Sequence, residues 1–86
     1  MVLHPHPGLV LRRDFLVKRG LSQAQLARLM SVPPQSLNAV VRGRRSVSVP
    51  MARKLAAALG TTAEFWLDLQ RDNDLHGEVD EISEAG

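Results

Sequence analysis

The chain has 86 residues, enough for one small domain, and its lack of cysteine excludes disulfide bonds and thiol catalysis. Its formal net charge of +2 hides an asymmetry: residues 1–63 carry ten Lys or Arg against one acid, and residues 64–86 carry eight acids against one base. No apolar run approaches the roughly 18 residues of a membrane span, and the N-terminus lacks the basic-then-apolar order of a signal peptide. We therefore expect a cytoplasmic protein whose basic body attracts phosphate groups.

Apolar residues recur at helical spacing along most of the chain, and no segment alternates with the period of two that marks a strand. The predicted helices span about residues 8–19, 23–30, 34–42, 50–59 and 63–72. Gly20, Gly43 and Gly60 end three of these helices. Ser22 caps the second helix, and Pro34 fits only in the first turn of the third. Short helices with brief connections predict an all-α fold, a compact five-helix bundle.

The same pattern divides the chain into three regions. Prolines keep residues 1–7 extended, residues 8–73 form the helical domain, and residues 74–86 form an acidic tail that is expected to be mobile. Within the domain, the second and third helices are joined by a tight turn. These two helices are predicted to form a helix-turn-helix pair.

The third helix has two incompatible faces. Its apolar face repeats at helical spacing and consists of Leu37, Val40 and Val41. Its polar face carries amides, one small side chain and a terminal cation, in Gln35, Asn38, Ala39 and Arg42. Arg44 and Arg45 follow directly after the helix. Amides read adenine edges, a methyl group meets thymine and arginines hold phosphates, so this helix suits the major groove of DNA.

Several motifs together indicate a family. They are His6-Pro7-Gly8, Gly20-Leu21-Ser22-Gln23, Val32-Pro33-Pro34-Gln35, Val41-Arg42-Gly43-Arg44-Arg45 and Glu64-Phe65-Trp66-Leu67. With these motifs, residues 6–75 resemble the HigA-type antitoxins of bacterial toxin–antitoxin modules, within the phage-repressor-like helix-turn-helix proteins. The resemblance implies a lambda-repressor-like fold and a homodimer that binds double-stranded operator DNA and represses its own operon. It also implies a toxin partner, which in this family is a small basic ribonuclease.

The chain departs from the family pattern at two places. Ser31 stands where such turns usually have glycine, which predicts a strained or differently shaped turn. Arg12 and Arg13 stand on the first helix, where relatives often have acids. The added positive charge leaves open which surface contacts a toxin.

Position and resemblance together give ten candidate DNA-binding residues. They are Ser22, Gln23, Pro34, Gln35, Ser36, Asn38, Ala39, Arg42, Arg44 and Arg45. Alternatives stay open for several of them. Gln23 is a plain exposed polar residue in one alternative, Ser36 caps the third helix in another, and the arginines form a solvated cluster in a third.

The fifth predicted helix is apolar on more than one side. Its apolar residues are Phe65, Trp66, Leu67 and Leu69. Because so small a monomer can hardly cover them all, we expect a dimer interface, with an intramolecular core as the alternative. No cofactor or metal is expected, since His4, His6 and His76 have no cysteine near them. The absence of a catalytic constellation predicts that the protein is not an enzyme.

Two other functions compete with the antitoxin. One is a stand-alone phage-like transcriptional repressor without a toxin partner. The other is a protein-interaction module that kept the fold and lost DNA binding. The polar stripe and the arginine cluster count against the second.

Overall fold

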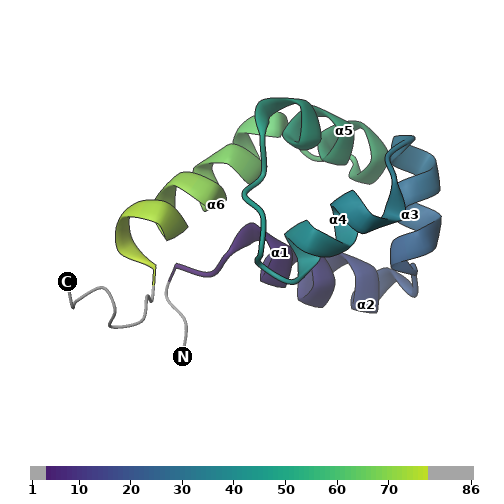
Figure 1. Ribbon diagram of the computed structural model, residues 1–86, viewed down its shortest axis with the longest axis horizontal. Coiled ribbons are helices and arrows are strands. Elements are labelled where there is room, and N and C mark those ends of the chain that lie inside the picture. The colour runs from purple at the N-terminus through teal and green to yellow at the C-terminus, as the bar shows by residue number, and fades with distance from the viewer. Residues whose placement is uncertain (1–3, 78–86) are drawn as a thin grey trace.

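The computed structural model describes residues 4–77, and every regular element within them is helical (Figure 1). The elements in chain order are α1 (Pro7–Val10), η1 (Leu11–Leu16), α2 (Val17–Arg19), α3 (Gln23–Met30), α4 (Pro34–Val41), α5 (Val49–Leu59) and α6 (Ala63–His76). The first three follow one another without a break, so residues 7–19 form one helix with a π-helical middle. The predicted all-α fold of five helices is confirmed. None of the helices in this part of the chain is long and apolar enough to cross a membrane.

The ends of the helical domain differ from the prediction. α1 begins at Pro7, because proline suits the first turn of a helix, so the extended segment ends one residue earlier than expected. α6 continues to His76, four residues past its predicted end, and the predicted boundary after residue 73 therefore falls inside a helix. Residues 78–86, the rest of the predicted acidic tail, lie outside the described residues.

Side-chain caps explain where three of the helices begin. The hydroxyl groups of Ser22, Ser48 and Thr62 accept hydrogen bonds from backbone N–H groups in the first turns of α3, α5 and α6. Ser31 ends α3 with a φ of 57°, a left-handed conformation that is uncommon for a residue with a side chain. The strain expected in this turn is therefore present, and it sits between the two helices of the helix-turn-helix pair.

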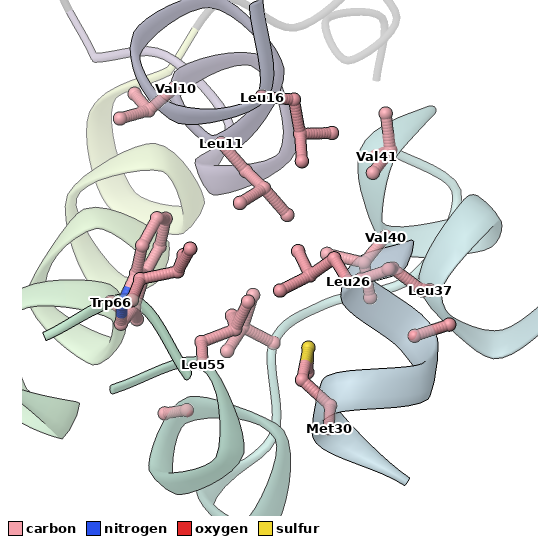
Figure 2. Close-up of a cluster of buried hydrophobic side chains, with 14 residues drawn as sticks. Val10, Leu11, Leu16, Leu26, Met30, Leu37, Val40, Val41, Leu55 and Trp66 are labelled. Atoms are coloured by element: carbon pink, nitrogen blue, oxygen red, sulfur yellow. The ribbon is translucent and has the colours of Figure 1, made fainter. Parts of the chain in front are cut away.

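One apolar core joins the helices. Its side chains with 0% exposure are Leu11, Leu26, Leu37, Val40, Ala52, Leu55 and Trp66. Figure 2 shows these and neighbouring buried side chains converging from the surrounding helices. Trp66 lies against Phe15, at 5.2 Å between ring centroids, and its indole N–H donates to the Thr61 hydroxyl at 2.7 Å. The burial of these large apolar side chains is the main favourable contribution to the stability of so small a domain.

The position of Trp66 corrects one prediction. Trp66 was expected in the dimer interface with Phe65, Leu67 and Leu69, and this is wrong because its side chain is enclosed within a single protomer. A fully buried indole leaves no surface for a second chain to cover. Phe65, in contrast, is 37% exposed, and Leu67 and Leu69 are only partly buried against the core. These three residues remain candidates for the dimer interface.

Gln70 is the buried polar residue of the core, and the sequence pattern did not reveal it. Its side-chain oxygen accepts a hydrogen bond from the backbone N–H of Val47 at 2.8 Å, and its amide nitrogen donates to Asp74 at 2.9 Å. A buried amide is stable only when its hydrogen-bonding groups are paired, as they are here. The contact ties α6 to the segment that joins α4 to α5.

Candidate nucleic-acid interface

α3 and α4 pack against each other as the two helices of a helix-turn-helix (Figure 1). The apolar face of α4 points inward, since Leu37 and Val40 are fully buried and Val41 is nearly so. The opposite face is open: Gln35 and Asn38 are exposed. The two incompatible faces predicted for this helix therefore lie as expected, one in the core and one on the surface.

The first turn of α4 has no side-chain cap. Its N-cap residue is Pro33, which has no hydrogen-bonding side chain, and Pro34 occupies the first helical position. The backbone N–H of Ser36 instead donates to the Pro33 carbonyl oxygen at 3.0 Å. The alternative in which Ser36 caps the helix is therefore not the structure observed. Gln35 and Ser36, exposed and partly exposed, lie at a helix N-terminus, where partial positive charge favours a phosphate group.

A hydrogen bond links the two helices across the candidate interface. The side-chain amide of Asn38 donates to the side-chain oxygen of Gln23 at 2.9 Å. Gln23 begins α3 and Asn38 lies in the middle of α4, so the two amides form a single unit. Within the pair, the two amide hydrogens of Gln23, the second amide hydrogen of Asn38 and the carbonyl oxygen of Asn38 are left to contact DNA. Sequence spacing indicated both residues but not this pairing.

Ser22 has a structural role at the start of α3. Its hydroxyl accepts from the Gln25 N–H at 3.0 Å, and the Gln25 side chain accepts from the Ser22 N–H at 2.9 Å. This reciprocal capping box fixes the beginning of the helix. The hydroxyl hydrogen of Ser22 is still available as a donor to phosphate. Gln25, which supports this geometry, was not identified from the sequence.

The segment after α4, residues 42–46, is called here the basic loop. Arg42 ends the helix, and Gly43 turns the chain with a φ of 75°. The backbone N–H groups of Arg44 and Arg45 then donate to the Ala39 carbonyl oxygen at 2.9 and 3.2 Å. These bonds fold the loop back onto the end of α4, so that its arginines lie beside the polar face.

The arginines of the basic loop are exposed, and no ion pair to them is formed within residues 4–77. The ion pairs of residues 4–77 are Arg13 with Asp14 and Arg71 with Asp68, and neither involves the loop. Because no carboxylate among the described residues pairs with them, these guanidinium groups can bind phosphates, for which their fork of donors is suited. The sequence-predicted residues lie on α3, α4 and the basic loop, and these elements are contiguous, since α3 contacts α4 and the loop is bonded to Ala39.

Comparisons with known proteins agree with this arrangement. A helix-turn-helix family model matches residues 12–66. Antitoxin HigA-1 of Vibrio cholerae is 40% identical over 68 residues, which cover 79% of this chain and 64% of that protein. The chain spans 62–65% of the length of three curated relatives that it matches, HigA-1 among them.

Solved structures show the same likeness. The Pseudomonas aeruginosa antitoxin HigA with the higBA promoter gives a TM-score of 0.80 at 39% identity, covering 83% of this chain and 77% of that one. The antitoxin GraA in complex with its operator gives 0.77 at 45% identity, covering 83% and 72%. The chain therefore belongs to the helix-turn-helix family. Within that family it is similar to HigA-type antitoxins, in agreement with its motifs.

Proposed function

We propose that the protein is a homodimeric antitoxin that binds operator DNA, represses its own operon and neutralises a cognate toxin. The observation that carries this proposal is the exposed polar face of α4 beside the basic loop. It is supported by the likeness to antitoxins whose structures contain a promoter or an operator. Since operator DNA lies in the bacterial cytoplasm, we place the protein there.

In this proposal α4 enters the major groove. Gln35, Asn38 and Ala39 contact base edges, because they lie on the polar face of the helix. The basic loop and the start of α3 hold the phosphates on either side. A two-fold dimer places two copies of α4 about 34 Å apart, so the operator is an imperfect palindrome with half-sites one helical turn apart.

The dimer is proposed to form through α6. Phe65 is a large aromatic residue that is 37% exposed, and Leu67 and Leu69 on the same helix are partly buried. Sedimentation velocity at micromolar concentration tests this directly. We expect a dimer for the wild type and a shift toward monomer for Phe65→Ala, with Val17→Ala, another exposed apolar side chain, as the control. A wild type that sediments as a monomer would contradict the proposed interface.

DNA binding is tested by its dependence on salt. Arg44→Ala and Arg45→Ala should each lower the slope of log affinity against log salt by about one unit, because each removes one phosphate contact. Arg71→Ala is the matched control, since Arg71 lies on α6 and pairs with Asp68. Fluorescence anisotropy on a labelled duplex measures these slopes. Binding that does not respond to salt would require another account of the basic loop.

One observation favours a second candidate, a repressor without a toxin partner. Arg12 and Arg13 are exposed on the first helix, and Arg13 pairs with Asp14 at 3.1 Å. A cationic first helix is unfavourable for a basic toxin. Co-expression with the neighbouring open reading frame separates the two candidates. Rescue of growth and co-purification support the antitoxin, and a harmless neighbour that does not co-purify supports the repressor.

A further inference from the structure

The His6-Pro7-Gly8 segment lies outside the helix-turn-helix, yet it meets the end of α4. Pro7 and Gly8 are buried and His6 is partly buried at the beginning of α1, which packs against both α4 and α6. The segment is part of a family motif, but it has no part in the DNA interface formed by α3, α4 and the basic loop. Its contacts with α4 and the basic loop indicate a role for it.

Gly8 allows α1 to touch the backbone of α4. A Cβ atom at Gly8 would overlap the carbonyl oxygen of Val40 and would stand 2.9 Å from that of Val41. Only glycine permits such an approach between backbones. Val40 and Val41 end α4, so α1 is packed against the point from which the basic loop departs.

His6 contacts the basic loop itself. Its Nδ1 atom accepts the backbone N–H of Gly8 at 2.9 Å, which caps α1 and leaves the ring hydrogen on Nε2. Its Cγ atom is 3.8 Å from the place where a Cβ atom on Gly43 would stand, an ordinary van der Waals distance. One ring therefore lies between the start of α1 and Gly43 of the basic loop.

α6 holds the segment in place from the other side. The side-chain amide of Asn73 donates to the carbonyl oxygen of His4 at 2.8 Å. The rings of His4 and His76 also lie 5.2 Å apart between centroids. The expectation that residues 1–7 form only an extended arm therefore misses these contacts, which fix His4 against the end of α6.

We propose that His6 is a positioning residue for operator binding, which holds the basic loop so that Arg44 and Arg45 face the phosphate groups. Gly8 serves the same end by letting α1 lie against the last turn of α4. Neither residue touches DNA in this proposal. This positioning role rests on the proposed function, and the experiments below distinguish a failure of the positioning role from a failure of the proposed function.

Two substitutions divide the roles of the imidazole. His6→Asn places an oxygen near the position of Nδ1 and keeps an N-cap that asparagine performs well, but its side chain is too short to reach the basic loop. His6→Gln places an amide near the position of Nε2 and keeps the contact to the loop, while the cap is lost. A purely structural role for His6 predicts that Asn is the better replacement in every measurement.

The first measurement follows the loop without DNA, by amide hydrogen exchange of the full chain. In His6→Asn we expect the N–H groups of Arg44 and Arg45, which donate to Ala39, to exchange about tenfold faster, because the loop loses the ring that lies beside Gly43. The N–H of Leu26, which donates to Ser22 in α3, is the control and should not change. Unchanged exchange at Arg44 and Arg45 would overturn the proposal.

The second measurement uses a labelled duplex selected by the wild-type protein from a random-sequence pool. We expect His6→Asn to keep the wild-type melting temperature but to bind about tenfold more weakly with a smaller salt slope. His6→Gln should melt earlier and bind close to the wild type at a temperature where it is folded. Equal affinity of His6→Asn and wild type would overturn the positioning role alone. A wild type that selects no duplex would overturn the proposed function, and the exchange experiment would still decide the role of His6.

Discussion

α4 and α6 are both amphipathic helices, but they present opposite surfaces. α4 shows amides to the outside and is followed by the exposed arginines of the basic loop. α6 shows the acids Glu64 and Asp68 together with the apolar side chains of Phe65 and Leu75, the latter 67% exposed. The basic side attracts phosphates and the acidic side repels them, so under the proposed function this charge distribution orients the protein on DNA with α4 toward the phosphates.

The two helices also differ in how they are anchored. The buried side of α4 consists of aliphatic side chains, and its polar face takes part in one interhelical hydrogen bond, between Asn38 and Gln23. α6 is held by the indole of Trp66 and by the buried amide of Gln70. Changes on the inside of α6 should therefore affect folding, and changes on the outside of α4 should affect binding.

The largest effect is expected for Trp66→Ala. Its side chain is fully buried and hydrogen-bonded, so its removal should lower the free energy of unfolding by about 3–5 kcal/mol. Urea denaturation followed by circular dichroism measures the loss. Phe65→Ala is the control next to it in the chain and should lose much less. If the two variants were equally stable, the contrast between the inner and outer sides of α6 would disappear.

Gln70→Ala comes next. It removes the acceptor for the buried N–H of Val47, and an unsatisfied group of this kind costs about 1–3 kcal/mol. Asp74→Ala is the matched control. It removes the partly buried hydrogen bond from the Gln70 amide nitrogen to Asp74 and leaves the bond between Gln70 and Val47 in place. Urea midpoints should therefore fall further for Gln70→Ala than for Asp74→Ala. The reverse order would show that the bond to Val47 contributes little.

Gln35→Ala examines the outer side of α4. It should weaken binding to the preferred operator by about 1–3 kcal/mol and relax the preference at one base pair per half-site, while stability and non-specific binding stay unchanged. Titration of matched and mismatched duplexes separates these effects. Gln25→Ala is the control amide, because Gln25 closes the capping box of α3. An equal loss on both duplexes would mean that Gln35 positions the helix and reads no base.

The contrast between α4 and α6 also explains which features of the interface could be predicted from the sequence. The faces of α4 were predictable because helical period alone decides which residues share a side. The bond between Gln23 and Asn38 was not, since it joins side chains 15 residues apart whose distance depends on how the two helices pack. On α6, the run of adjacent apolar residues indicated burial without indicating which protomer provides it, and Trp66 was therefore misplaced.

The N-terminal segment illustrates a second limit. His6 and Gly8 were visible as parts of a motif, but their contacts with Gly43 and Val40 arise only when α1 meets the end of α4. Periodicity describes a residue relative to its own helix and gives no information about close approaches between helices. For this reason the roles of the helix-end residues His6 and Gly8 could be recognised from the structure but not from the sequence.

The smallest predicted effect concerns pH, and it involves His6, which lies between the two regions. Burial lowers the pKa of His6 below its ordinary value of 6.5, against the opposing influence of Asp74 on α6 and of the Arg45 backbone in the basic loop. The folded protein thus prefers the neutral imidazole, and the unfolded chain binds a proton more readily. Stability should therefore be complete above pH 6.5 and should decrease as the pH falls through 6.5 toward the lowered pKa of the folded state.

Urea midpoints of the wild type and His6→Asn, compared between neutral pH and a pH just above the titration of the carboxylates, isolate this contribution. The two proteins differ only at residue 6, so the difference between them reports on the His6 side chain. The wild type should lose more stability on acidification than His6→Asn, because asparagine does not titrate. Parallel losses would show that the imidazole is equally protonated in the folded and unfolded states, and that the contacts linking α1 to the basic loop do not depend on its neutral form.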